Sequence, residues 1–139
     1  RIADVCLRVD EAVTIAGRIR GLAEASLADA AAGREGPDPR PEVLQAAVWR
    51  AARDGLDGEL LDPVGGRLRP AADLVGHLLD VARPGLAATG DWEQVAGGVE
   101  HILREGTGAR RQRQAFARDG HMHDVIRLIE QETVAGTHA

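Results

Sequence analysis

DEAVTIAGRIRGLAEASLADAAA, residues 10–32, is the stretch that decides the fold class. Its aliphatic residues, from Val13 to Leu27, recur about every three to four positions, which is the spacing of one face of an α-helix. Asp10 is a favourable residue for capping a helix N-terminus, and Glu11 adds a negative charge to the first turn. The stretch therefore predicts one long amphipathic helix.

Proline and glycine divide the chain after this helix. Residues 33–41 contain three prolines and two glycines, which predicts a surface loop within one unit, with a domain boundary as the alternative. Beyond the loop we expect a helix over residues 41–55, a β-hairpin over 58–69 and a helical bundle over 70–133. Pro84 is expected to bend or end a helix of that bundle.

The segment before the long helix is rich in apolar residues and predicts a strand remnant over residues 1–8. The chain opens there without an initiator methionine. We therefore expect residues 1–139 to be a single fragment of a longer protein. Its expected fold class is mostly α with a short β-hairpin.

Composition limits the classes of function. All basic residues are arginine, and the net charge is −5, so the chain as a whole is not expected to bind nucleic acid. No apolar run is long enough to cross a membrane. Cys6 is the only cysteine, which excludes an intrachain disulfide and fits a reducing compartment. A cytoplasmic protein is the default expectation.

Two arginines near the end of the 41–55 helix are candidate site residues. Arg50 and Arg53 are three positions apart, so they lie on the same face of a helix. One interpretation is that they cap the helix C-terminus, where positive charge is favourable. The other is that they form a paired clamp on a phosphate or carboxylate, for which the planar guanidinium is suited.

A glycine-rich segment, GTGARRQR at residues 106–113, is similar to a phosphate loop before a helix. It lacks the Lys-Ser/Thr pair of such a loop, so a connector between helices is the preferred interpretation. An alternative function follows from its arginines: a self-standing helical module that contacts an acidic partner through Arg110, Arg111 and Arg113. The histidines show no ligand spacing, and no metal ligand is predicted.

Several segments, in this order, resemble motifs of the glutamate–cysteine ligase type 2 family of carboxylate–amine ligases. They cover nearly the whole chain and are RIAD at 1–4, VDEAV at 9–13, WRAARDGLDG at 49–58, DP at 62–63, RP at 69–70, GD at 90–91 and GTGARRQR at 106–113. The resemblance implies that the chain is the C-terminal helical portion of an α+β fold similar to that of glutamine synthetase.

The resemblance also implies an activity, in which ATP, with Mg²⁺, activates the γ-carboxylate of glutamate as an acyl phosphate that an amine such as that of cysteine attacks. Arg1 would lie near the nucleotide phosphates, and Arg50 and Arg53 would act as catalytic residues that contact substrate or phosphate. The family's expected glutamate before Arg1 lies outside this sequence, so the fragment alone is expected to be inactive. A homo-oligomer remains open.

Overall fold

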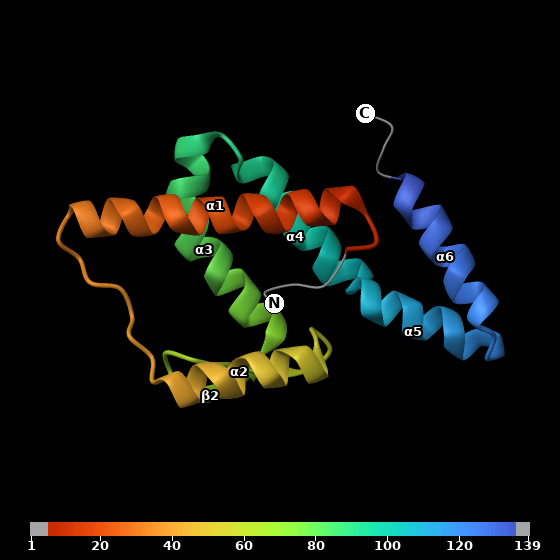
Figure 1. Ribbon diagram of the computed structural model, residues 1–139. Helices are drawn as coiled ribbons and strands as arrows, with labels where there is room; N and C mark the ends of the chain where they lie inside the picture. Colours follow the sequence, from red (N-terminus) through yellow and green to blue (C-terminus); the bar gives the residue numbers. More distant parts are fainter. Residues whose placement is uncertain (1–5, 136–139) are drawn as a thin grey trace. The chain divides into compact units, whose positions relative to one another are not determined.

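A computed structural model of the chain describes residues 6–135, which are mostly helical with one short β-hairpin (Figure 1). This confirms the predicted fold class at that level. The chain divides into two compact units: residues 18–93 form unit 2, and the described residues on either side form unit 1. The described elements are α1 (Val9–Ala31), α2 (Pro41–Asp54), β1 (Glu59–Asp62), β2 (Arg67–Pro70), α3 (Ala71–Thr89), α4 (Trp92–Glu105), α5 (Gly108–Asp119) and α6 (Met122–Ala135).

Unit 2 contains a close contact between α1 and α3 that is lined by small residues. Gly21 and Ala25 of α1 are buried, as are Ala82 and Gly85 of α3. A Cβ added at Gly85 would collide with the carbonyl oxygen of Gly21, so only glycine permits this approach. Leu86 is fully buried and fills the space beside Gly21.

The aliphatic stripe of α1 does not lie in this contact. An amphipathic helix normally turns its apolar stripe toward the core. Val13, Ile19 and Leu27 are nevertheless exposed. In the part of α1 that belongs to unit 1, the buried positions include the polar residues Glu11 and Thr14. The periodicity therefore predicted the helix correctly, but most of its large aliphatic residues are exposed, and only Ile15 and Leu22 are half-buried.

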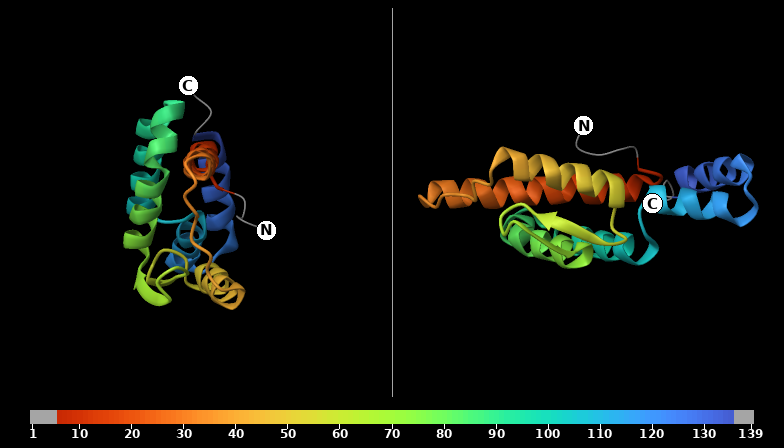
Figure 2. Two further views of the ribbon diagram at one scale, coloured as in Figure 1. Left: turned by 90° about the vertical axis from the view of Figure 1, so that its left-hand side faces the viewer. Right: turned by 90° about the horizontal axis from the view of Figure 1, so that it is seen from below.

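The hairpin and α2 form the other part of unit 2. Strands β1 and β2 pair antiparallel, with Glu59 opposite Pro70 and Asp62 opposite Arg67. Helix α2 packs against β1. It ends before Gly55, whose φ of +63° is accessible to glycine and whose N–H donates to the carbonyl of Ala51. The loop of residues 33–40 joins α1 to α2 within this unit (Figure 2).

Of the two outcomes expected at Pro84, a bend or an end of helix α3, the end does not occur. The helix neither ends nor restarts there but continues to Thr89, where Gly90 closes it in the left-handed conformation with φ of +76°. Pro84 lies one residue before Gly85, inside the segment that packs on α1. Proline lacks an N–H to donate within a helix, but the helix continues on both sides of it.

Unit 1 contains the first part of α1, α4 from Gln94 onward, α5 and α6. Gly98 of α4 faces the side chain of Thr14 so closely that a Cβ would overlap it. Helices α5 and α6 lie side by side, as both Figure 1 and Figure 2 show. The hydroxyl of Thr107 accepts the N–H of Arg110 at 3.3 Å and caps α5. The loop 106–107 is thus a helix connector.

Two further expectations concern the ends and the membrane. Most of the strand predicted over residues 1–8 lies outside the described residues, and Cys6 to Arg8 do not form a strand. Within residues 6–135, no helix combines the length and the apolar character that a bilayer crossing requires.

Candidate functional site

The C-terminal end of α2 displays one exposed guanidinium in a defined position. The guanidinium of Arg53 lies over the indole of Trp49, 4.5 Å from the ring centroid. Its Nε and one terminal nitrogen donate to the carboxylate of Asp54 at 2.6 and 2.8 Å. The Arg53 side chain stays 52% exposed. These contacts hold Arg53 at the surface, where it can meet a ligand.

Arg50 points toward the hairpin instead. Its Nε donates to the backbone carbonyl of Glu59 at 2.8 Å and lies 3.5 Å from a carboxylate oxygen of Asp54. Because Glu59 begins β1, Arg50 fastens the end of α2 to the hairpin. Arg50 and Arg53 therefore both contact Asp54, but Arg50 also has a structural partner.

The charges of this cluster favour an anionic ligand. Arg50 and Arg53 share the single carboxylate of Asp54, so these three side chains together carry one net positive charge. The hydrogen bond from Arg53 lowers the pKa of Asp54, so the carboxylate stays ionised near neutral pH. An incoming phosphate or carboxylate could compete with Asp54 for the fork of Arg53. The cluster thus has the chemistry of a phosphate contact.

The motif residue Asp62 has a local role in the hairpin turn. One carboxylate oxygen accepts the N–H groups of Val64 and Gly65 at 3.0 and 3.1 Å. Arg69 lies 3.8 Å from the other oxygen. The backbone donors, Gly65 first, lower the pKa of Asp62. This geometry shapes the turn and does not require a ligand.

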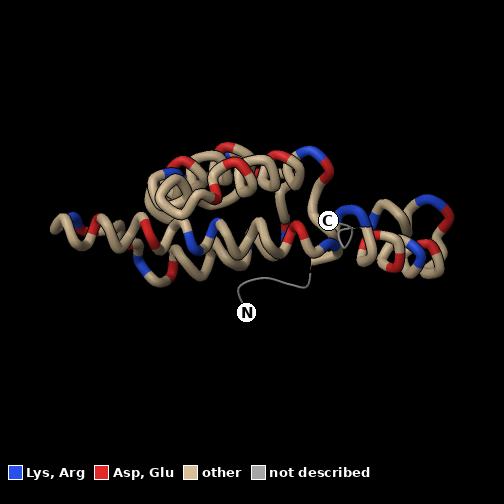
Figure 3. The backbone as a smooth tube through the Cα atoms, turned by 90° about the horizontal axis from the view of Figure 1, so that it is seen from above, with Lys and Arg blue, Asp and Glu red and all other residues tan. Residues whose placement is uncertain are grey.

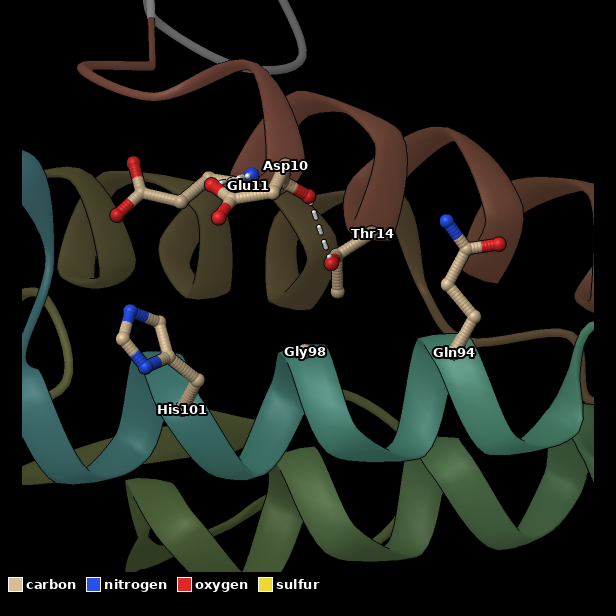
Figure 4. Close-up of a pocket in the computed structure, with 6 residues that line it drawn as sticks. All are labelled: Asp10, Glu11, Thr14, Gln94, Gly98 and His101. Atoms are coloured by element: carbon tan, nitrogen blue, oxygen red, sulfur yellow. Dashed lines mark hydrogen bonds between the residues drawn. The ribbon is translucent and has the colours of Figure 1, made fainter. Parts of the chain in front are cut away.

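Unit 1 holds a small pocket of about 220 Å³ between α1 and α4 (Figure 4). Its lining residues carry carboxylate, hydroxyl, amide and imidazole groups and are Asp10, Glu11, Thr14, Gln94, Gly98 and His101. Pockets for drug-sized ligands usually measure about 300–1,000 Å³. The pocket is therefore too small to enclose a nucleotide by itself.

Both carboxylates of this pocket are already paired with arginine. Arg8 donates to Asp10 at 2.7–3.1 Å, and this hydrogen bond lowers the pKa of Asp10. Glu11 accepts from Arg111, which also donates to Glu132 at 3.1 Å. The side chains of Glu11 and Arg111 are only 7% and 12% exposed. The arrangement is a buried ion-pair network joining α1, α5 and α6 in unit 1.

This network removes Arg111 from the alternative function. The alternative function requires Arg110, Arg111 and Arg113 to contact an acidic partner. The guanidinium of Arg111, however, faces Glu11 and Glu132 inside unit 1. Basic and acidic positions are also interspersed along the described helices (Figure 3). A basic surface formed by all three arginines is therefore not supported.

Other candidate chemistries are limited by the described residues. Between residues 6 and 135, no three His, Cys, Asp or Glu side chains come together as metal ligands would. Burial, and then the nearby Glu11, raises the pKa of the Cys6 thiol, which disfavours the reactive thiolate. Arg1, the candidate nucleotide contact, lies outside the described residues.

Comparison with known proteins identifies relatives over nearly the whole chain. The sequence model of the glutamate-cysteine ligase family 2 (GCS2) matches residues 1–132. A Frankia alni protein provisionally named glutamate–cysteine ligase 2-2 is 47% identical over 133 residues, which is 96% of this chain and 35% of the relative. A Streptomyces coelicolor protein provisionally named glutamate–cysteine ligase 2 is 43% identical over 97% of this chain and 37% of its own length.

A third relative, from Rhodococcus jostii, is provisionally named glutamate–cysteine ligase 2-3. It is 40% identical over 99% of this chain, which spans 17% of that protein. This chain therefore spans less than two fifths of the length of each of these relatives. No solved structure gave a significant match.

Proposed function

Because this chain belongs to glutamate–cysteine ligase family 2, we propose that it forms part of an ATP-dependent carboxylate–amine ligase. In the proposed reaction ATP phosphorylates the γ-carboxylate of glutamate, and the amine of a second substrate such as cysteine displaces the phosphate. The match of the family model to residues 1–132 is the observation that carries this proposal. The chain would be the C-terminal helical portion of an α+β fold similar to that of glutamine synthetase.

Arg53 is the residue of this chain that we propose to contact the transferring phosphate. It is exposed, held by Trp49 and Asp54, and belongs to a cluster with a net positive charge. A fixed guanidinium stabilises negative charge that develops on a phosphoryl group. Arg50, which donates to the carbonyl of Glu59, would position the end of α2 so that Arg53 is presented correctly.

The described residues offer a contact for a nucleotide phosphate but no set of ligands for its metal ion. The cluster on α2 offers a cation for a phosphate, and Arg1 is a second proposed contact that lies outside the described residues. ATP would supply the phosphoryl group. No cluster of Mg²⁺ ligands occurs within residues 6–135, so we assign no step of the reaction to a metal ligand of this chain. A cytoplasmic location and a homo-oligomeric state stay predictions.

The test compares two exposed arginines in the longer ligase polypeptide that carries this chain. Arg53→Ala should lower ATP- and glutamate-dependent phosphate release on the order of a hundredfold, the usual effect of losing one charge-stabilising donor. Arg104→Ala is the matched control, because Arg104 is 62% exposed and pairs with the adjacent Glu105 at 3.1 Å. Arg104→Ala should leave turnover unchanged.

Circular dichroism of both variants would confirm that they are folded. Equal turnover of Arg53→Ala and the unsubstituted enzyme would remove Arg53 from the proposed site. Phosphate release that does not depend on glutamate in the unsubstituted enzyme would contradict the ligase proposal itself.

A further inference from the structure

In the part of α1 that belongs to unit 2, two of the three large aliphatic residues are exposed, and the third, Leu22, is half-buried. Ile19, Ala23 and Leu27 follow at intervals of four residues, so they form one strip along the helix. Ile19 is 50% exposed and Leu27 is 66% exposed, and Ala23 is exposed as well. We call these three residues the α1 strip.

The contacts with α3 explain why the α1 strip is left uncovered. Helix α1 faces α3 with Gly21 and Ala25, and the approach is so close that a Cβ at Gly85 would meet the backbone of both residues. Burying a large aliphatic side chain contributes roughly 1.5–3 kcal/mol, whereas glycine and alanine contribute little. The side of α1 that is buried against α3 thus carries small residues, and the α1 strip still has apolar area to bury.

Charged residues adjoin the α1 strip in the sequence, and one of them has a partner inside unit 2. Arg20, next to Ile19 in sequence, is paired with Asp91 inside unit 2, and Asp91 also accepts the hydroxyl of Thr89 at 2.6 Å. Arg20 is thus neutralised by a residue of the same unit, whereas Arg18, on the other side of Ile19 in the sequence, is half-buried. What the α1 strip offers to a partner is aliphatic surface, with Ala23 leaving room between two larger side chains.

We propose that the α1 strip is a docking surface for the part of the ligase polypeptide that lies outside this chain. The length of the relatives supports this occupant, because the matched region is 35–37% of the Frankia and Streptomyces proteins and the larger part of each lies elsewhere. An apolar surface of that part would cover Ile19 and Leu27. The inference rests on the proposed function only in requiring a longer ligase polypeptide, and it is independent of the reaction.

Thiol labelling tests this contact. Leu27→Cys and, separately, Glu35→Cys are made in the longer polypeptide and in the 139-residue chain; Glu35 is an exposed residue of the loop after α1. Maleimide incorporation at each position is followed by mass spectrometry. In the longer polypeptide, position 27 should react at least about tenfold more slowly than position 35, because a packed side chain is reached only through local opening. In the 139-residue chain the two rates should be similar.

Two results would overturn the proposal. One is fast labelling of position 27 in the longer polypeptide. The other is protection of position 27 in the 139-residue chain that rises with its concentration, which would make a second copy the occupant. Leu27→Asp gives an independent readout: it should lower the melting temperature of the longer polypeptide but not that of the 139-residue chain, and equal effects would contradict the docking.

The labelling result and the activity result can be separated. Slow labelling of position 27 in a polypeptide that releases no glutamate-dependent phosphate would support the docking surface and contradict the proposed reaction. Fast labelling of position 27 in an active enzyme would support the proposed reaction and contradict the docking surface.

Discussion

Substituting Gly85 by alanine tests the close crossing of α1 and α3 that organises unit 2. The added methyl group would lie 2.9 Å from both the backbone nitrogen of Ala25 and the Cβ of Glu24, and closer still to the carbonyl oxygen of Gly21. Two of these atoms belong to the backbone, so they can move away only if the whole helix shifts. We therefore expect separation of the two helices.

The size of the effect follows from two opposing contributions. Overpacking a close contact costs typically about 1–3 kcal/mol, and a backbone obstacle places Gly85→Ala at the upper end. Replacing glycine by alanine inside a helix gains about 1 kcal/mol. The free energy of unfolding should therefore fall by about 2 kcal/mol. The same substitution at Gly76 of α3, where no atom lies within 4 Å of the added Cβ, should raise it by up to about 1 kcal/mol.

Urea unfolding of the 139-residue chain, followed by tryptophan fluorescence, measures this difference. Both tryptophans, Trp49 and Trp92, belong to unit 2, so the signal reports the unit that contains the crossing. If Gly85→Ala were as stable as Gly76→Ala, the close approach of α1 and α3 would be wrong, and with it the explanation of why the α1 strip is exposed.

Two further outcomes concern charged groups. Arg111→Ala should lower the free energy of unfolding by about 3–5 kcal/mol, because it leaves Glu11 buried without its partner. Substitution of the exposed Arg104 by alanine should lower it by less than about 1 kcal/mol. Equal losses of unfolding free energy, measured by calorimetry, would argue against a buried network. The pKa of Asp62 lies below its ordinary value of 3.8, because the N–H groups of Gly65 and, second, Val64 donate to its ionised carboxylate. The stabilisation of the turn by Asp62 is therefore complete above pH 3.8 and is lost as the pH falls through the lowered pKa. The amide NMR signals of Val64 and Gly65 should shift with a midpoint below 3.8, and a midpoint above that value would contradict these bonds.

Local signals in the sequence predicted the elements well. Pro41 and Gly55 bracket α2, and the Pro-Val-Gly-Gly segment at 63–66 marks the turn between β1 and β2. Such signals act over a few residues, where proline and glycine restrict or permit particular backbone conformations. They do not determine which face of a helix meets which partner. The periodicity of α1 revealed an aliphatic stripe, but only the crossing at Gly21 shows that small residues are the buried ones.

The candidate site was predictable to a similar extent. The spacing of Arg50 and Arg53 placed both on one side of α2, and the structure shows that they share Asp54. The bond from Arg50 to the carbonyl of Glu59 joins two elements and has no local sequence signal. The pairing of Arg111 with Glu11 spans 100 residues. Local sequence patterns predicted that Arg111 is a surface cation, whereas the tertiary structure buries it.

The most direct test of the central claim follows the oxygen atoms of glutamate in the longer ligase polypeptide. With glutamate labelled by ¹⁸O in its γ-carboxylate, formation and displacement of an acyl phosphate transfers one carboxylate oxygen to the released phosphate. We predict that mass spectrometry finds one ¹⁸O in each phosphate formed, and that omission of the amine substrate slows its release. Phosphate without the label, released by a folded enzyme in the presence of ATP, glutamate and amine, would contradict the proposed carboxylate–amine ligase mechanism.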